Sequence, residues 1–188
     1  MRLVLLGPPG AGKGTQAVRL AARLGVPAIS TGDIFRSNIA GGTELGRLAQ
    51  SFTSSGRLVP DEVTNDMVRD RLAQPDVTGG FLLDGYPRNA AQVEALDGML
   101  AAAGTPLDAV VLITADTDAL VTRLLKRAEI EGREDDTEDV IRHRQEVYAA
   151  ETAPLVDLYR ERGLLVPVDG MGDVDEVTAR MTDALGTR

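Results

Sequence analysis

The sequence GPPGAGKGT, Gly7 to Thr15, joins a short apolar run, Leu3–Leu6, to a helical pattern. Its glycines permit a tight turn in which successive backbone N–H groups point inward at the start of the next helix, an arrangement that binds anions. Lys13 adds a positive charge that can reach the outer phosphates of a nucleotide. The spacing therefore predicts a phosphate-binding loop, the alternative being an ordinary Gly/Pro turn between strand and helix.

Gly14 stands where such loops usually carry a Ser or Thr whose hydroxyl binds Mg²⁺. Magnesium keeps several of its waters, so it can be held by phosphates and contacted by carboxylates through water. Asp84, which ends the apolar run FLLD, is the better candidate for such a carboxylate, and Asp33 is a second one. The sequence identifies no side chain that must bind the metal directly.

The composition predicts one domain over residues 1–188 and excludes several classes of protein. The net charge of −9, with three Tyr, three Phe and no Trp, argues against a nucleic-acid surface. The chain has no Cys, so it can form neither a disulfide nor a zinc site built on thiolates. Its first residues are too short a run for a signal peptide, and no run is long enough to cross a membrane, so we expect a cytoplasmic protein.

Short apolar runs alternate with helical patterns, which predicts an α/β fold with a parallel sheet and helices on both faces. Ligands of such sheets bind at the carboxyl ends of the strands, where Gly7, Asp84 and Ala115 should lie. The expected strands are Leu3–Leu6, Ala28–Ser30, Phe81–Leu83, Ala109–Ile113 and Leu164–Val168. The expected helices are Gly14–Leu24, Asp61–Ala73, Ala90–Ala102, Thr117–Arg127, Thr137–Arg162 and Val174–Leu185, with Pro154 kinking or dividing the long one.

Two segments interrupt this alternation. Residues 30–59 are helical with Gly-rich joints, and residues 126–136 are short and strongly charged. Each is expected to extend over the strand ends as a substrate arm or a lid.

Separated motifs in the chain resemble those of the adenylate kinase family. Ser30-Thr31-Gly32-Asp33 precedes Arg36, and Asp84-Gly85-Tyr86-Pro87-Arg88 precedes Gln92. Two further motifs follow in the same order as in the family, Arg133-x-Asp135-Asp136 and Arg142-x-Arg144. The resemblance therefore covers essentially the whole chain. It implies a three-layer P-loop fold with a central five-stranded parallel sheet, a nucleoside-monophosphate-binding arm over residues 30–59 and a short lid over 126–136.

The resemblance also implies a role for each matching position. ATP would be bound by Gly10, Ala11, Gly12, Lys13, Gly14, Thr15, Arg127 and the backbone near Gly172. AMP would be bound by Thr31, Arg36, Arg57, Leu58, Val59, Gly85, Tyr86, Pro87, Arg88, Gln92, Arg133 and Arg144. The catalytic set would be Lys13, Arg36, Arg88, Arg123, Arg127, Arg133 and Arg144.

Simpler interpretations of these arginines stay open. Arg123 and Arg127 are four residues apart and could be solvated helix neighbours, while Arg133 and Arg144 lie among acidic residues that could pair with them on the surface. His143 falls in a helical pattern between two arginines, and we interpret it as a surface residue.

The function implied is Mg²⁺-dependent transfer of a phosphoryl group from ATP to AMP, giving two ADP, by a monomer that uses no zinc. Gln92 offers a donor and an acceptor to adenine, and Thr31 agrees with AMP, since relatives acting on UMP or CMP tend to carry Asn and Ala there. A UMP/CMP kinase is one alternative, and a nucleotide-dependent switch is another. Phosphoryl transfer to an ionised phosphate needs no general base, only positioning and positive charge.

Overall fold

The computed structural model describes residues 1–116, 120, 122–124 and 137–186. Five strands form one parallel sheet in the order β2-β3-β1-β4-β5. The predicted sheet is confirmed, with strand ends within one residue of expectation, and the strands are β1 Arg2–Leu6, β2 Ala28–Ser30, β3 Phe81–Asp84, β4 Ala109–Thr114 and β5 Leu165–Asp169.

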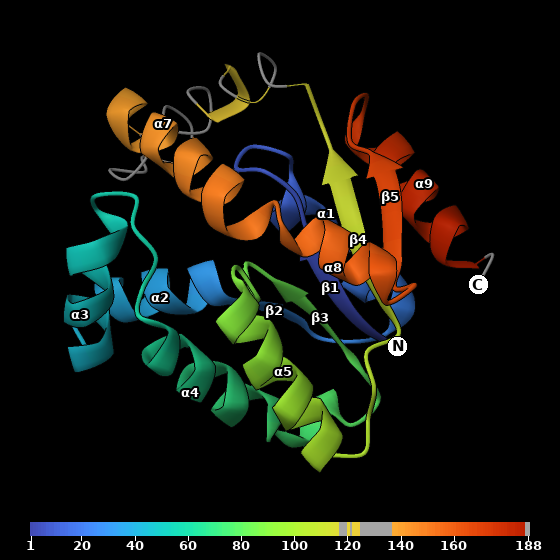
Figure 1. The fold of residues 1–188 in the computed structure, drawn as a ribbon, viewed down its shortest axis with the longest axis horizontal. Coiled ribbons are helices and arrows are strands. Elements are labelled where there is room, and N and C mark those ends of the chain that lie inside the picture. The colour runs from blue at the N-terminus through green and yellow to red at the C-terminus, as the bar shows by residue number, and fades with distance from the viewer. Residues whose placement is uncertain (117–119, 121, 125–136, 187–188) are drawn as a thin grey trace.

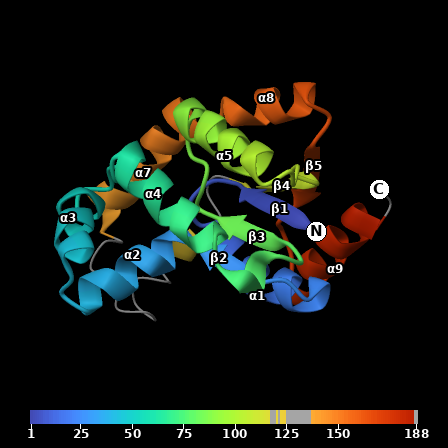
Figure 2. The ribbon, with the colours of Figure 1, turned by 90° about the horizontal axis from the view of Figure 1, so that it is seen from below.

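Helices cover both faces of this sheet (Figure 1). One face carries α1 and α9, and the other carries α4, α5 and α8, as the view from below shows (Figure 2). Helices α2 and α3 stand beside the sheet (Figure 1). The bounds are α1 Lys13–Leu24, α2 Thr31–Ala40, α3 Glu44–Thr53, α4 Asp61–Leu72, α5 Ala90–Ala102, α7 Glu138–Val147, α8 Leu155–Glu161 and α9 Val174–Gly186.

Side chains of the central strand alternate between two hydrophobic cores. Leu3 and Leu5 pack in the core that contains α1 and α9, whereas Val4 and Leu6 pack in the core of α4, α5 and α8. All four are at most 3% exposed. Burial on both faces explains why the strands are continuous apolar runs, each buried Leu or Val contributing about 1.5–3 kcal/mol.

The carboxyl ends of β1, β2 and β3 meet at one edge of the sheet. Asp84 is in register with Leu5 of β1 and with Ser30 of β2. The glycine-rich loop leaves β1 at this edge, and α2 begins here immediately after Ser30. The edge predicted for ligand binding therefore brings together the loop, Asp84 and the first turn of α2.

The predicted long helix over 137–162 is divided, as Pro154 indicated. α7 passes into a π-helical turn, Tyr148–Thr152, and α8 starts directly after Pro154. His143 lies in α7, as expected. Of the helix predicted over 117–127, only Leu120 and residues 122–124 are described, and these are helical.

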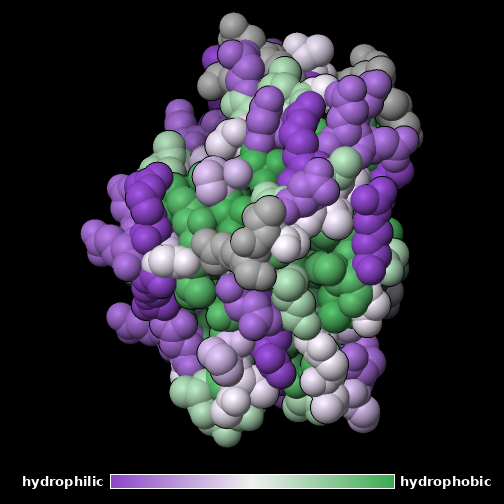
Figure 3. Space-filling model, turned by 90° about the vertical axis from the view of Figure 1, so that its right-hand side faces the viewer, coloured by the Kyte–Doolittle hydropathy of each residue, from purple (hydrophilic) through white to green (hydrophobic). Residues whose placement is uncertain are grey.

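β5 forms one edge of the sheet and contains Pro167, a position where a missing backbone donor is tolerated. The side nearest β5 and α9 shows hydrophilic residues interspersed with hydrophobic ones (Figure 3). Among the described helices, none combines the length and apolar character needed to cross a membrane.

Candidate active site

The loop between β1 and α1 has the backbone of an anion site. Gly7, Gly10 and Gly12 have φ values of 149°, 87° and 87°, which favour glycine. At Gly10 a Cβ atom would also lie 2.9 Å from the backbone oxygen of Leu120. Gly12 precedes α1, and within the described residues no side chain caps this helix, so its first N–H groups are available to a ligand.

Lys13 folds back across this loop. Its Nζ donates to the backbone oxygen of Gly7 at 2.7 Å and to that of Pro8 at 3.0 Å. Nε2 of Gln145 in α7 donates to the Pro9 oxygen at 3.1 Å, which ties α7 to the loop. Ala11 is 3% exposed and its N–H donates to the Pro8 oxygen at 3.1 Å, so this amide is committed to the turn.

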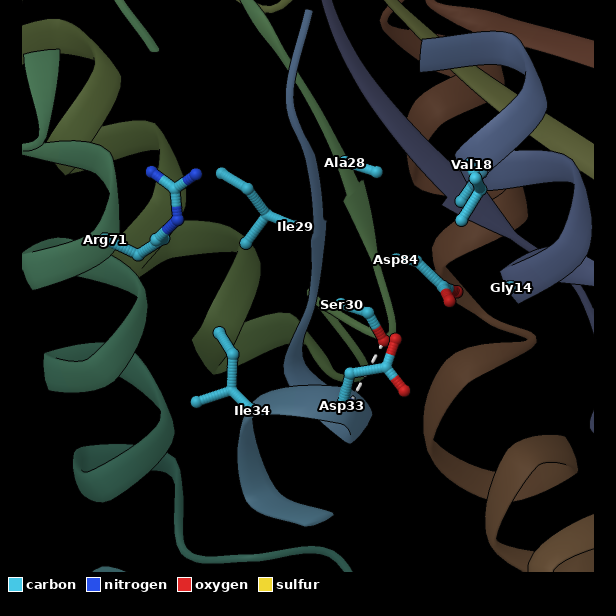
Figure 4. A pocket seen from close by; sticks show the side chains of 10 residues that line it. Gly14, Val18, Ala28, Ile29, Ser30, Asp33, Ile34, Arg71 and Asp84 are labelled. Atoms are coloured by element: carbon cyan, nitrogen blue, oxygen red, sulfur yellow. Dashed lines mark hydrogen bonds between the residues drawn. The ribbon is translucent and has the colours of Figure 1, made fainter. Parts of the chain in front are cut away.

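The carboxylates of Asp33 and Asp84 face a cavity of about 180 Å³ between α1, β2 and α2 (Figure 4). Asp84 is 8% exposed. Burial raises its pKa most strongly, while the positive charges of Lys13 and Arg88 oppose that effect. Asp33 is exposed, and its backbone N–H donates to Ser30 Oγ at 3.2 Å.

These two carboxylates fit a hydrated magnesium ion, a hard cation that prefers oxygen ligands. Gly14 lines the same cavity, and a Cβ built on it would lie 3.7 Å from Asp84 Oδ2, so the missing side chain leaves space beside the carboxylate. Across the described part of the chain, no group of three or more His, Cys, Asp or Glu side chains could hold a metal by itself.

Arg36 and Arg88 lie beside these carboxylates, and the charges of Arg36 and Arg144 both act on Arg88. Crowding by protein atoms lowers the pKa of Arg88 most strongly, the charges of Arg144 and Arg36 lower it further, and Asp84 opposes them. Arg88 Nε donates to the Gly85 oxygen at 2.8 Å, although part of the side chain is exposed. Arg36 pairs with Asp33 at 2.5 Å. Like charges gathered in this way favour binding of an anion between them.

A second cavity, of about 340 Å³, lies between the end of the 30–59 segment and α7. It is lined by Arg57, Leu58, Val59, Pro60, Asp61, Asn89, Val147 and Glu151. The Arg57 side chain turns away onto α3, where it stacks on the Phe52 ring at 5.0 Å and donates to Ser51 O and Ser55 Oγ. The Arg57 side chain is thereby held within the 30–59 segment.

Gln92 is held by a hydrogen-bond network that the sequence did not indicate. It is 2% exposed, its Oε1 accepts from the Arg88 N–H at 2.8 Å and its Nε2 donates to Asp61 Oδ1 at 2.7 Å. Asn89 Nδ2 donates to both oxygens of Asp61, at 3.0 and 3.1 Å. Asp61 and Asn89 were missed because each has an ordinary explanation at a helix N-terminus. Their only signal was proximity to the predicted 57–59 and 85–88 segments.

Thr31 and Tyr86 are buried and have structural partners. Thr31 Oγ1 donates to the Gly85 oxygen at 3.0 Å, and a Cβ on Gly85, whose φ is 80°, would lie 2.8 Å from that hydroxyl. Tyr86 is 0% exposed and its hydroxyl donates to Asn65 Oδ1 at 2.7 Å. The Tyr86–Pro87 bond is cis.

Arg123 adjoins the turn after β5. Its guanidinium lies 3.4 Å from the backbone oxygen of Gly170, and Gly172 completes the same turn with a φ of 107°. This places Arg123 beside the position predicted to contact adenine. Arg127, Arg133 and the whole 126–136 segment lie outside the described residues, so their predicted roles are not tested.

Comparison with known proteins gives the same family along the whole chain. The family model described as adenylate kinase matches residues 5–164. The chain is 65% identical to an adenylate kinase of Kocuria rhizophila over 184 residues, covering 98% of both chains. It is 60% identical to one from a Nocardioides species, covering 98% of this chain and 97% of the relative. With one from Thermobifida fusca it is 57% identical over the full length of both.

Proposed function

The chain belongs to the adenylate kinase family, and we propose a role for each site residue in the transfer of a phosphoryl group from ATP to AMP, which gives two ADP. The observation that carries the proposal is that Arg36 pairs with Asp33 and Arg88 bonds to the Gly85 oxygen next to Asp84, with the charges of Arg36 and Arg144 both acting on Arg88. Phosphoryl transfer leaves little covalent work for side chains, so positioned positive charge supplies most of the catalysis.

ATP binds along the loop at the start of α1. Apart from the Ala11 amide, which is bonded within the turn, residues 10–15 supply backbone N–H groups and the Thr15 hydroxyl, and Lys13 exchanges its bonds to Gly7 and Pro8 for phosphate oxygens. Arg123 and Arg127 add charge on the outer side, and the Gly172 turn borders the adenine. Because α1 lacks a side-chain cap within the described residues, the phosphates satisfy its first amides.

AMP binds on the opposite side of Asp84. Its phosphate meets Arg36, Arg88, Arg133 and Arg144, and its base enters the cavity beside residues 57–61. Gln92 recognises the adenine edge, and Thr31, Gly85, Tyr86 and Pro87 shape the wall of the site. The guanidinium groups bind phosphate bidentately and remain charged at every relevant pH, so they align donor and acceptor while countering the charge that develops in transfer.

Magnesium bound with ATP would be held by the phosphates and, through water, by Asp84 and Asp33. Its contribution is to neutralise charge on the triphosphate. No side chain has to remove a proton, because the attacking oxygen belongs to an ionised phosphate. Exclusion of water prevents hydrolysis of ATP, and we assign this task to the 30–59 arm and the 126–136 lid. We further propose that the protein acts as a cytoplasmic monomer.

A phosphorus NMR time course tests the proposal. Mg²⁺-ATP alone should persist, ADP should form when AMP is added, and pure ADP should return ATP and AMP. Faster turnover with UMP or CMP than with AMP would instead indicate a pyrimidine nucleotide kinase. Loss of ATP without any monophosphate would contradict the proposal and favour the nucleotide-dependent switch.

A further inference from the structure

The orientation of the Gln92 carboxamide is fixed at both ends. Oε1 accepts from the Arg88 backbone N–H at 2.8 Å, and Nε2 donates to Asp61 Oδ1 at 2.7 Å. A carboxylate can only accept and a backbone N–H can only donate, so the reversed amide would set oxygen against oxygen and hydrogen against hydrogen. Only one of the two orientations of this side chain satisfies its neighbours.

Asp61 is itself held in place. It is the first residue of α4 and lines the second cavity, the one between residues 57–61 and α7. Asn89 donates to both of its carboxylate oxygens, at 3.0 and 3.1 Å, and Asn89 Oδ1 also accepts from the Gln92 backbone N–H at 2.9 Å. The start of α4 is thereby joined to the start of α5 across the floor of the cavity.

The fixed orientation has a consequence for base recognition. Each end of a carboxamide can make two hydrogen bonds, so Gln92 retains one acceptor site on Oε1 and one hydrogen on Nε2. A 6-aminopurine complements that pair, since its amino group donates and its ring N1 accepts. A 6-oxopurine has the opposite pattern and would need the reversed amide.

We propose that Asp61 is a positioning residue that fixes the Gln92 carboxamide in the orientation complementary to a 6-aminopurine and so selects AMP over 6-oxopurine monophosphates. This inference rests on the proposed function, in which Gln92 recognises the acceptor base. Asp61 acts through Gln92 and has no part in the transfer of the phosphoryl group.

The test is the acceptor preference of Asp61→Asn. An amide at position 61 can turn either its oxygen or its NH₂ toward Gln92, so the reversed orientation keeps only the penalty at the Arg88 backbone N–H. The ratio of kcat/KM for AMP to that for IMP should fall about tenfold, the value of one hydrogen bond to a charged group. The KM for AMP should rise while kcat changes little, because the arginines are untouched.

Glu62→Gln is the matched control, because Glu62 lies in the same first turn of α4, is exposed and loses the same charge. It should leave the AMP to IMP ratio unchanged. In a Gln92→Ala background, Asp61→Asn should produce no further change in that ratio, since the two residues act as one unit.

Thermal unfolding shows whether each variant is folded, and if Asp61→Asn is not, Asp61→Ser carries the same expectation with a hydroxyl that either donates or accepts. An unchanged ratio in the folded variant would overturn the inference. An equal change with and without Gln92 would overturn it as well. Neither result touches the proposed function, which fails only if the unaltered protein makes no ADP from ATP and AMP.

Discussion

The two halves of the site differ in how the chain builds them. On the ATP side, the consecutive residues 7–15 form the loop, and its anion-binding groups belong largely to the backbone. On the AMP side, three separate parts of the chain meet: Thr31 bonds to the Gly85 oxygen, and Gln92 of the same 85–92 segment bonds to Asp61. A contiguous motif can be recognised locally, whereas a distributed network exists only in the folded chain.

The halves should also respond differently to substitution. The loop depends on positive φ angles at glycines, so it is sensitive to a Cβ added at Gly7, Gly10 or Gly12. On the AMP side, the buried side chains of Thr31 and Gln92 are held by hydrogen bonds, so loss of a partner leaves a buried polar group unpaired at a cost of about 1–3 kcal/mol.

The largest effect should come from Arg88→Lys. Lysine keeps the charge but cannot bind phosphate through a planar fork or retain the Nε bond to the Gly85 oxygen. We expect kcat to fall by about 10²–10³-fold, as when one preorganised donor to a transition state is removed. Steady-state ADP formation measures it.

Arg142→Lys is the control for that change. Arg142 also lies near the site in sequence, but it is exposed and paired with Glu138 at 2.7 Å. It should retain nearly full activity. Similar losses in both variants would mean that the arginines act as a general positive field, and the comparison between the two halves would lose its basis.

How far the sequence predicted the molecule follows the same division. The strands were placed within one residue because burial on both faces leaves an unmistakable apolar pattern, and the loop was placed by its glycines. The partners of Gln92 were not predictable, because Asp61 lies 31 residues away in sequence and only the folding of α4 against α5 brings the two together. The bond from Gln145 to the Pro9 oxygen spans 136 residues and carries no local signal.

Asp84 belongs to neither half alone, and Asp84→Asn separates stability from activity. Burial raises its pKa, so the folded state holds this proton more tightly than the unfolded state does. Stability therefore falls as pH rises from the ordinary Asp value of 3.8 through the raised one. Without ligand, the variant should be the more stable protein at neutral pH, by about 2–4 °C for each kcal/mol relieved.

The same change should lower the apparent affinity of the reaction for Mg²⁺ by about 10–100-fold, as loss of an outer-shell ligand does. Thermal unfolding from pH 4 to 8 and a magnesium titration of activity measure the two effects. Asp157→Asn, an exposed carboxylate on α8, should alter neither. A variant that is less stable than the parent at neutral pH would show that Lys13 and Arg88 more than offset the burial of Asp84.

The smallest effects should come from two buried tyrosines, which isolate the cost of a single hydroxyl. Tyr86 donates to Asn65 Oδ1 at 2.7 Å, within the AMP-side network, whereas the Tyr159 hydroxyl is buried without a hydrogen-bond partner among the described residues. Tyr86→Phe should lower the free energy of unfolding by about 1–2 kcal/mol, because it leaves Asn65 Oδ1 unpaired. Tyr159→Phe removes a hydroxyl that has already lost its water, so stability should stay within about 1 kcal/mol of the parent or rise.

Urea unfolding compares the two variants at equal ring volume. Equal losses would mean that packing around each ring, rather than the network, controls its contribution, and the AMP side would then resemble the rest of the core.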